Sequence, residues 1–461
     1  YDEATAATTH ALAAAKNTLA ISGDASTYAE HKARLQELEE KEGTYVAAEK
    51  RFAALLLMMR EGAEHGITSC LKRSTMKKDE TMAFMPTNLV CHSMRAHVGT
   101  TASDRMWAVM THGCSAAHLH GFKDGGLRKK RHEHRLDVVS CQLLSIVAAS
   151  FLTTIHMAVD GAWENGDEYM RHLAIAADVG YLLDIESLLS TMGNEKGMLE
   201  DMSEGVKWLN HHVYLEVVPS ATATAAEVAA ISLDGQDVVM VFDLPEATYA
   251  ALPSAMHKHK QPKRTPTLSS PHASSDARAA RIKLTTVLFT QGINEVQSVA
   301  NTVGDNSLQD EINRESLATL MEYMGRYVKH VKKDVVPSLD QHLAALHAAV
   351  DNQSNRKQVN ILIESSALCR RIGAGRTTCC KSGKDRTAMS VTLEFSKILV
   401  DQMGVKQGMH LCQTMRERGV RRTNVLVNTG KTKYAFNSIQ LKCLPSCYQP
   451  PAHTANSHVT S

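Results

Sequence analysis

The stretch TTCCKSGKDRTAMS, residues 377–390, joins two adjacent cysteines to a short basic segment that contains one glycine. The residues before it predict a short strand that ends at Cys379. Apolar side chains after it recur at the spacing of one helix face: Val391, Phe395, Ile398 and Leu399. The stretch is therefore predicted to be a loop between a strand and an amphipathic helix, a setting in which backbone N–H groups bind anions.

The segment from Cys380 to Arg386 has the form C-x5-R and contains the groups that phosphate transfer through a cysteine needs. Gly383 permits a backbone turn that other residues disfavour, so that successive N–H groups can converge on a tetrahedral anion. The positive field at the helix start favours the thiolate of Cys380, which is the nucleophilic form. Arg386 presents a planar fork for two phosphate oxygens. We therefore predict Cys380 as nucleophile and Arg386 as the residue that binds the phosphoryl group.

The C-x5-R spacing alone is not specific, because the chain contains it a second time from Cys412 to Arg418. The second copy lacks a glycine, and its residues suit a helix, in which backbone N–H groups are already bonded. A basic turn that caps a helix is the structural alternative for the first copy. Its glycine and its position between strand and helix favour the catalytic interpretation.

The remaining loop residues predict further contacts. Those expected to bind substrate are Lys381, Ser382, Gly383 and Lys384. The two lysines suit a substrate with several phosphates. The hydroxyl of Thr387 is placed to donate to the sulfur as it leaves. Cys379 offers a protective disulfide with its neighbour, but adjacent cysteines pair only with strain.

The composition is that of a globular protein, with 461 residues, 43% hydrophobic and 22% charged. The net charge is only +2, yet residues 370–433 contain fourteen Lys/Arg against four Asp/Glu. This basic region predicts an anionic partner or a solvated basic face. Aromatic residues make up only 5% and are not interleaved with the basic ones, so no nucleic acid is expected. Ten irregularly spaced cysteines favour a reducing, cytosolic setting over a disulfide scaffold.

Patterns along the chain predict its organisation. Residues 1–135 are expected to be mainly helical, with a basic loop at 103–135. Residues 136–450 form the expected catalytic region, which a disordered polar insertion at 254–282 interrupts. Residues 451–461 are predicted to be a flexible tail.

Within the expected catalytic region, residues 167–183 predict one helix. Strands are predicted at 212–219, 230–243 and 283–290, the second of them a hairpin that turns at Asp234. The apolar passage at 138–159 is interrupted by polar residues and predicts a buried helix rather than a membrane span.

CCKSGKDRTAMSVTLE (residues 379–394) resembles the active-site motif of the inositol polyphosphate 4-phosphatases. The same resemblance extends to other segments, namely PTNL (86–89), SAAHLHGFKDGGLRK (115–129), KGMLEDM (196–202), VLFTQGINEVQSVAN (287–301), GDNSLQDEINRESL (304–317), NVLVNTGKTKYAFNSIQL (424–441) and LPSCYQPP (444–451). It implies an α/β (α+β) fold with a cysteine-phosphatase-like, that is protein tyrosine phosphatase-like, catalytic domain and additional N-terminal helices.

The resemblance also implies an activity. The implied reaction removes the 4-phosphate of phosphatidylinositol 3,4-bisphosphate, and of soluble inositol 3,4-bisphosphate and 1,3,4-trisphosphate, with neither metal nor cofactor. Cys380 would form a cysteinyl-phosphate that water hydrolyses. The implied partners are a phosphoinositide headgroup or inositol phosphate and a peripheral membrane surface, with a cytoplasmic location and recruitment to membranes.

The sequence departs from the family in two respects. Gly383 stands where the animal enzymes are expected to have Ala, and it matches bacterial effector phosphoinositide phosphatases of broader specificity. The family's N-terminal C2 domain is not evident. A broader phosphoinositide phosphatase and a catalytically silent phosphoinositide-binding module therefore stay open as alternatives.

The general acid has two candidates. Asp385 directly precedes Arg386, as in the Sac-type lipid phosphatases that the loop also resembles. Asp351 lies twenty-nine residues before Cys380, which matches the tyrosine-phosphatase arrangement. We prefer Asp385, with a structural role for it as the alternative.

Three further groups have weaker patterns. The spacing of His112, Cys114, His118 and His120 matches no common zinc site, so no metal is expected. The basic segment 123–135 contacts headgroups or is a solvated loop. A further phosphate, or acidic helices, would pair with Arg416, Arg418, Arg421 and Arg422.

Overall fold

The computed structural model describes residues 89–97, 104–114, 128–160, 163–234, 237–257, 281–304, 306–352, 357–419, 422 and 432–455. The predicted N-terminal helices before residue 89 and most of the predicted insertion lie outside the described residues.

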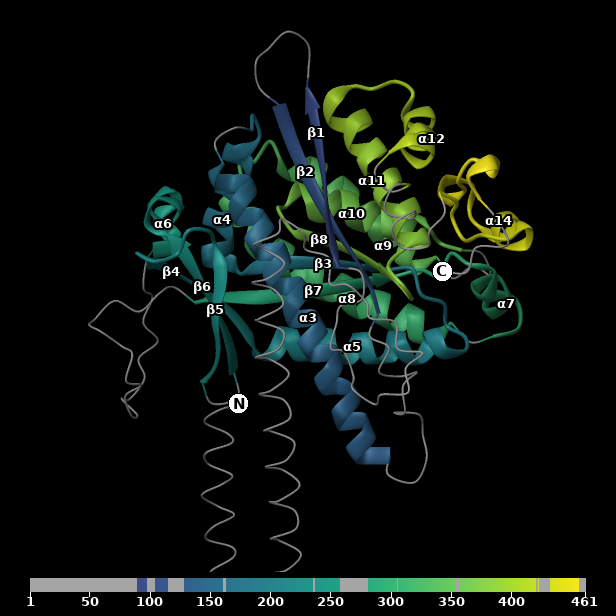
Figure 1. The fold of residues 1–461 in the computed structure, drawn as a ribbon, viewed down its shortest axis with the longest axis horizontal. Coiled ribbons are helices and arrows are strands. Elements are labelled where there is room, and N and C mark those ends of the chain that lie inside the picture. Colours follow the sequence, from purple (N-terminus) through teal and green to yellow (C-terminus); the bar gives the residue numbers. More distant parts are fainter. Residues whose placement is uncertain are drawn as a thin grey trace, which may run out of the picture.

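Eight strands of the described chain form one mixed sheet in the order β1-β2-β8-β3-β7-β4-β6-β5 (Figure 1). The strands are β1 Val90–His97, β2 Asp104–Gly113, β3 Tyr181–Ser187, β4 Val213–Ser220, β5 Glu227–Asp234, β6 Asp237–Pro245, β7 Ile282–Thr290 and β8 Gly375–Cys380. Neighbours among β2, β8, β3 and β7 are parallel. Their carboxyl ends therefore lie at one edge of the sheet, here called the carboxyl edge, where ligands bind in open α/β sheets.

The outer strands complete the sheet on both sides. β1 pairs antiparallel with β2, and β5 pairs antiparallel with β6. β4 is parallel to β6 and meets β7 antiparallel over two residue pairs, Tyr214–Lys283 and Leu215–Ile282. The sheet is thus mixed, with its parallel part at the centre.

Helices cover both faces of the sheet (Figure 1). The described helices are α3 Arg128–Val159, α4 Gly166–Val179, α5 Asn194–His212, α6 Glu246–Ala251, α7 Glu295–Val303, α8 Ser307–Tyr327, α9 Val336–Asp351, α10 Asn360–Arg371, α11 Asp385–Met403, α12 Gly408–Arg418 and α14 Ser438–Cys443. On one face α3 and α5 pack against Leu183 and Ile185 of β3. On the other, α8, α9 and α10 pack against β7, and α11 packs against Val109 of β2. The fold is therefore a mixed α/β fold in three layers.

Most of the elements predicted around the loop are confirmed. β8 ends at Cys380, one residue later than predicted, and α11 follows directly after the loop. The strands predicted at 212–219, 230–243 and 283–290 appear as β4, the β5–β6 pair and β7. The helix Val139–Val159 is long and apolar enough to cross a membrane, yet 72% of its most apolar window is buried inside the fold, as expected for a core helix.

The single helix predicted at 167–183 is wrong at its end. α4 ends at Val179, Gly180 has a φ of 104°, and β3 begins at Tyr181. Every residue of β3 is buried. A strand that is buried on both faces lacks the alternating pattern of a half-exposed strand, so that its apolar run merges with that of the preceding helix.

The prediction of a basic loop at 103–135 is wrong at both ends. Asp104–Gly113 is β2, and α3 already begins at Arg128. β1 is likewise a strand, within residues 1–135 that were predicted to be mainly helical. β1 pairs with β2, and β2 pairs with β8, which lies far along the chain, and local pattern does not report such pairing.

Parts of the predicted tail and insertion belong to the folded body. Residues 254–257 form a 3₁₀ turn with Met256 buried. Thr454 is fully buried, and its carbonyl accepts from the N–H of Tyr434 at 2.9 Å. Residues 452–455 therefore belong to the folded body. Residues 258–280 and 456–461 lie outside the described residues.

Candidate active site

The sulfur of Cys380 lies at the carboxyl edge, where β8 ends and the loop of residues 381–384 begins. Neighbouring strands hold the end of β8, because the N–H of Leu188 donates to Cys379 O at 2.9 Å and that of Cys114 to Cys380 O at 3.0 Å. The N–H of Gly383 donates to the Cys380 Sγ at 3.2 Å. The loop thus turns back over the sulfur and directs an N–H group at it.

Gly383 meets two separate constraints. Its φ is +65°, in the left-handed region that favours glycine. A Cβ on it would lie 2.5 Å from the backbone nitrogen of Gly113 and 2.5 Å from the carbonyl carbon of His112. The turn was predicted from the sequence. The close approach of β2 to the loop is visible only in the fold.

Arg386 is held by a buried carboxylate that the sequence analysis did not identify. Its Nη1 donates to Oε2 of Glu195 at 3.0 Å, and its Nη2 to Oε1 at 2.5 Å. Both side chains are 12% exposed. Glu195 also accepts from the N–H and the hydroxyl of Ser190 at 2.9 and 3.1 Å. The guanidinium is therefore fixed by a bidentate pair whose carboxylate is itself fixed.

Both members of this pair are ionised. Burial opposes ionisation of Glu195, but attraction to the Arg386 guanidinium outweighs it and lowers the pKa of that carboxyl. Burial likewise opposes the charge on Arg386, and attraction to Glu195 and Cys380 raises its pKa above the ordinary value. The fold thus stabilises a cation beside the sulfur.

The remaining donors of Arg386 have the geometry for phosphate. Its Nη1 also donates to the carbonyl of Leu188 at 2.7 Å, so that three of its five N–H groups bond to described residues. The Nε–H and the second Nη2–H form the side-on pair of the guanidinium. Such a pair binds two oxygens of one phosphate group.

No local pattern identifies Glu195. It lies in the first turn of α5, where acidic residues are common because of the helix dipole. Its partner is 191 residues away in the chain. Only the meeting of α5 with the start of α11 reveals its role.

The other predicted loop residues are placed as follows. Lys381 is exposed, while Ser382 and Lys384 are partly buried. The Thr387 hydroxyl donates to the carbonyl of Lys384 at 3.1 Å and so closes the loop onto the helix. Its bond to the leaving sulfur stays a prediction.

The two candidate acids have different surroundings. Asp385 is buried, and its Oδ1 accepts from the N–H of Ala435 at 3.1 Å. This contact ties the loop to the C-terminal segment and supports a structural role. Asp351 ends α9 with its side chain 61% exposed, paired with His347 at 2.9 Å.

The chain after Asp351 returns to the carboxyl edge. The N–H of Gln358 donates to Oε1 of Gln291, which directly follows β7, at 2.8 Å. Residues 353–356 lie outside the described residues. The segment after Asp351 therefore reaches the edge that carries Cys380.

The two adjacent cysteines belong to different surroundings. Cys379 packs in the core on the α5 side, where its Sγ lies 3.6 Å from the sulfur of Met202. Cys380 belongs to the apolar cluster of Leu188 and Ala388. Both are free thiols. A disulfide between them would have to join opposite faces of the strand, as strand alternation places them.

Two of the candidate metal ligands, His112 and Cys114, lie beside the loop, since the N–H of Cys114 donates to Cys380 O and His112 lies against Gly383. No group of metal-ligating side chains occurs within the described ranges, and His118 and His120 lie outside them. His112 is buried, which lowers its pKa to about 4 and leaves it neutral. Residues 123–127 and the side chains of 128–135 are not described.

Arg416 fits neither function that its pattern suggested. It is fully buried and donates to the carbonyls of Met389, Cys447 and Gln449 and to the hydroxyl of Thr392. It therefore joins α12 to α11 and to the C-terminal segment and takes part in neither phosphate binding nor acidic pairing.

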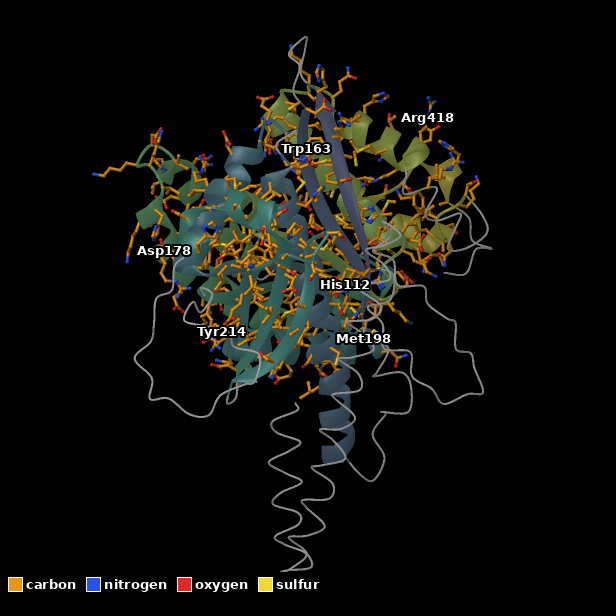
Figure 2. All side chains as sticks on the ribbon, turned by 60° about the vertical axis from the view of Figure 1, so that its left-hand side comes forward. His112, Trp163, Asp178, Met198, Tyr214 and Arg418 are labelled. Carbon is orange, nitrogen blue, oxygen red and sulfur yellow. The ribbon has the colours of Figure 1, made fainter. Side chains whose placement is uncertain are left out.

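The second C-x5-R copy is helical, as predicted, because it lies within α12. Cys412 is buried, whereas Arg418 is exposed at the surface (Figure 2). Arg422 donates to the carbonyls of Glu417 and Thr432, and Arg421 lies outside the described residues. The second copy forms no anion site.

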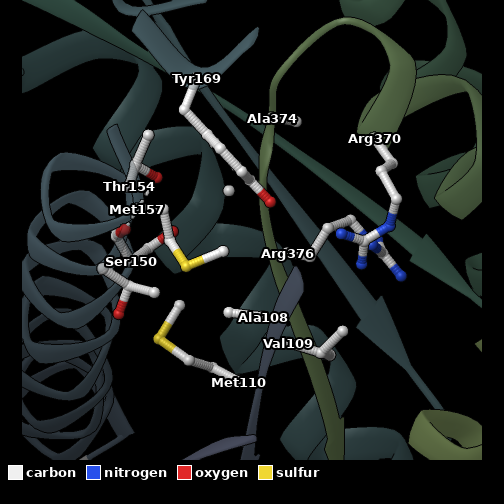
Figure 3. Close-up of a pocket in the computed structure, with 12 residues that line it drawn as sticks. Ala108, Val109, Met110, Ser150, Thr154, Met157, Tyr169, Arg370, Ala374 and Arg376 are labelled. Atoms are coloured by element: carbon white, nitrogen blue, oxygen red, sulfur yellow. Dashed lines mark hydrogen bonds between the residues drawn. The ribbon is translucent and has the colours of Figure 1, made fainter. Parts of the chain in front are cut away.

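A small cavity lies at the opposite end of β8 (Figure 3). Its volume is about 30 Å³, and its lining includes Tyr169, Gly375 and Arg376. This is room for one or two waters, not for an inositol ring. It is separate from the loop around Cys380.

These elements define an α/β protein in which a loop turns back over a cysteine and the following helix carries a carboxylate-held arginine. The family described as the INPP4A C-terminal domain matches residues 34–136 and 132–448. This chain belongs to that family.

Curated relatives include the type II inositol 3,4-bisphosphate 4-phosphatase of Rattus norvegicus, 30% identical over 329 residues, and the inositol polyphosphate 4-phosphatase type II of Homo sapiens, 31% identical over 328 residues. Each match covers 69% of this chain and 32% of the relative, so the chain spans about a third of their length. A more distant relative is the phosphatidylinositol 3,4,5-trisphosphate-dependent Rac exchanger 1 protein of Mus musculus, 25% identical over 62% of this chain and 18% of its own length.

Proposed function

We propose that this chain is a cysteine-dependent phosphatase that removes the 4-phosphate of phosphatidylinositol 3,4-bisphosphate, and of soluble inositol 3,4-bisphosphate and 1,3,4-trisphosphate. The observation that carries the proposal is the position of Arg386 beside Cys380, with a side-on face that Glu195 and Leu188 leave open. The names of the curated relatives support the substrate class. We also propose that the catalytic unit has a protein tyrosine phosphatase-like fold, which the cysteine loop at the carboxyl edge supports.

The proposed reaction has two steps. The Cys380 thiolate attacks the phosphorus, an S–P bond forms, and the bond from phosphorus to the inositol oxygen breaks as an acid protonates that oxygen. Water then attacks the phosphorus, the S–P bond breaks, and inorganic phosphate and the thiolate are released. Arg386 and the loop N–H groups stabilise the equatorial oxygens in both steps.

The experiment that tests this proposal is phosphate release from every phosphoinositide and from soluble inositol phosphates, with Cys380→Ser as the control. We expect the highest rate on 3,4-bisphosphates and none with the variant. Equal rates for wild type and variant would end the covalent mechanism. Comparable rates across all phosphoinositides would favour the broader, effector-type enzyme.

A catalytically silent binding module is the second candidate, because one relative is named as a Rac exchanger and not as a phosphatase. The intact set of Cys380, Gly383, Arg386 and Glu195 favours the enzyme. Binding of 3,4-bisphosphate headgroups without any phosphate release would favour the module.

Asp385 stays our proposed general acid, with Asp351 as the rival. The bond from the N–H of Ala435 supports instead a structural role for Asp385. Rates for Asp385→Asn and Asp351→Asn across pH separate these roles. Loss of the alkaline limb of the pH profile identifies the acid, since only the protonated acid can donate. A uniform loss with unchanged shape, together with lower stability, identifies a structural residue.

We also propose a cytoplasmic location with recruitment to anionic membranes. A thiolate nucleophile is readily oxidised and therefore suits a reducing compartment. The short helix α14 lies near the loop, because Lys357 bonds Cys443 O at 2.6 Å and Ile293 O at 3.0 Å, and Ile293 packs with Cys380. On α14, Ile439 is 66% exposed and Lys442 is exposed, a combination that suits a lipid surface.

A further inference from the structure

Behind the catalytic loop, five ionisable side chains form one group, here called the Arg376 cluster, in which all but the partly buried Arg370 are buried. Its members are Arg370, Arg376, Asp184, Glu186 and Glu394. They come from four elements: α10, β8, β3 and α11. The guanidinium groups of the two arginines lie next to one another beside β8 (Figure 3).

Arg376 is the centre of the cluster, with its side chain only 1% exposed. Its Nε donates to Glu394 Oε1 at 3.3 Å and its Nη2 to Glu394 Oε2 at 3.2 Å. The same Nη2 donates to Glu186 Oε2 at 3.2 Å, and Nη1 donates to Asp184. One planar group thus binds α11 and β3 to β8 in a fixed orientation.

Two further contacts extend the cluster. Arg370 of α10 donates to the same Glu394 carboxylate. The hydroxyl of Ser390 donates to Glu186 Oε1 at 2.5 Å. Because Ser390 and Glu394 are one turn apart, α11 is held at two successive points on the face that it turns toward β3 and β8.

Stability alone does not account for such a group. Taking charged side chains out of water costs several kcal/mol per ion, and apolar side chains of similar volume often serve stability equally well. What an ion cluster adds is direction, because its hydrogen bonds are satisfied in one arrangement of the four elements and not in others.

The cluster lies on the same elements that carry Cys380 and Arg386. Arg376 lies four residues before Cys380 on β8, and Glu394 lies eight residues, about two helical turns, after Arg386 on α11. β3, which carries Asp184 and Glu186, leads to the Leu188 carbonyl that Arg386 binds. The cluster therefore joins the two elements that flank the loop to the strand that receives the arginine.

We propose that the Arg376 cluster is a positioning device that sets the placement of Arg386 relative to the sulfur of Cys380. The inference rests on the proposed function, in which Cys380 is the nucleophile. Arg376 touches no reacting atom and acts through β8 and α11. It is therefore a positioning residue, and its effect belongs to the transition state, in which sulfur, phosphorus and guanidinium must all be aligned.

Arg376→Lys tests the proposal, because lysine keeps the charge but has no planar fork. With soluble inositol 3,4-bisphosphate we expect kcat to fall about 100-fold while KM changes less than about threefold. The inhibition constant of inorganic vanadate, which copies the five-coordinate phosphorus, should rise about as much as kcat falls. That of inorganic phosphate should stay near its wild-type value.

The matched control is Arg416→Lys. Arg416 is also fully buried and also contacts α11, but it binds no carboxylate and comes from α12. We expect a lowered melting temperature with the kcat and vanadate affinity of the wild type. A folded Arg376→Lys protein with wild-type kcat and vanadate affinity would overturn the proposal.

Glu394→Gln keeps the inference testable if Arg376→Lys does not fold. It weakens the tie between β8 and α11 and leaves Arg376 bonded to Asp184 and Glu186. A folded variant with about tenfold lower kcat and weaker vanadate binding supports the positioning role of the Arg376 cluster. Wild-type values of both reject that role.

The experiment separates this inference from the proposed function. Phosphate release by Cys380→Ser at the wild-type rate would reject the nucleophile and with it the proposed mechanism, whatever Arg376→Lys does. If Cys380→Ser is inactive and Arg376→Lys is fully active, the mechanism stands and only the positioning role fails.

Discussion

Two constraints act on Gly383: the positive φ of the loop and the close approach of β2. Gly404, at the end of α11, provides a matched comparison, since its φ of +68° is similar but nothing lies within 4 Å of an added Cβ. We expect Gly404→Ala to lower the unfolding free energy by about 1 kcal/mol and to leave the activity unchanged. Gly383→Ala should instead lower kcat/KM by about 100-fold, because its methyl group must push the loop away from Gly113.

Denaturant unfolding and phosphate release measure these two effects. Equal activity of the two alanine variants would mean that the loop tolerates displacement. The result bears on the family comparison directly, since an alanine is expected at this position in the animal enzymes.

Glu195 is the residue on which the orientation of Arg386 depends. Glu195→Gln keeps the shape but removes the charge, so that the guanidinium loses its ionic partner and one N–H···O bond. We expect kcat/KM to fall by about 10- to 100-fold. Glu195→Asp should recover part of the activity. Steady-state kinetics on a soluble inositol phosphate measures both variants.

Glu315→Gln is the control for this prediction. Glu315 also pairs with a cation, Lys207, at 3.1 Å, but both side chains are more than 40% exposed. An exposed pair contributes at most about 1 kcal/mol. Similar losses of activity in the two variants would show that the effect is not specific to the site.

The elements around the loop differ in how far the sequence reveals them. β8 and α11 were predicted because a cysteine–glycine loop and an amphipathic period mark their boundary. β3 was missed because all of its residues are buried and the alternating pattern is absent. β1 and β2 were missed because their stability comes from the partner strand and not from their own residues.

The Arg376 cluster, which joins β3, β8 and α11, should make the unfolding free energy depend on pH. Burial, opposed by Arg376, raises the pKa of Glu186 from 4.5 to about 7. The charged and hydroxyl groups that act on Glu186 are Arg376, Asp184, Glu394, Ser390 and Tyr448. The folded state therefore holds a proton between pH 4.5 and 7 that the unfolded state has released.

Because only the folded state holds this proton, the unfolding free energy falls as pH rises. The stability that this proton contributes is complete below pH 4.5 and is lost as pH rises through 7. We expect the unfolding free energy to fall by about 3 kcal/mol over this window through Glu186. Glu186→Gln should remove the slope, and urea unfolding from pH 5 to 8 measures it. A constant difference between wild type and variant across the window contradicts the assignment.

At the scale of the whole molecule, one edge of the sheet gathers the site. The carboxyl ends of β2, β8, β3 and β7 are adjacent, and Glu195, Arg386 and the C-terminal segment meet there. A lipid substrate has to approach this edge from a membrane. The surface beside the loop must then tolerate contact with lipid.

A substitution at the exposed Ile439 of α14 tests whether this helix contacts lipid. We expect Ile439→Asn to weaken binding to vesicles that contain anionic lipid by about fivefold to thirtyfold, because full burial of an aliphatic side chain contributes about 1.5–3 kcal/mol and Ile439 is 66% exposed. Activity on soluble inositol phosphate should not change. Vesicle sedimentation measures binding.

Met321→Asn is the matched control on α8. Met321 is 45% exposed, and Tyr323, two residues later, bonds to Gly180 O, just before β3 begins, so this end of α8 lies at the opposite edge of the sheet. Equal loss of vesicle binding in the two variants would exclude α14 as the contact surface.

The sequence by itself determined the loop and the candidates for nucleophile and phosphate-binding arginine, since Cys380, Gly383 and Arg386 lie within seven residues and their chemistry depends on local spacing. It also identified the family through segments that can be compared one by one. The tertiary structure alone decided which carboxylate holds Arg386, why a side chain at position 383 meets β2, and which charges lie behind the loop. These partners come from α5, β2 and β3, about 190 residues or more away along the chain. Local patterns do not encode them, because long-range contacts depend on which elements become neighbours in the fold.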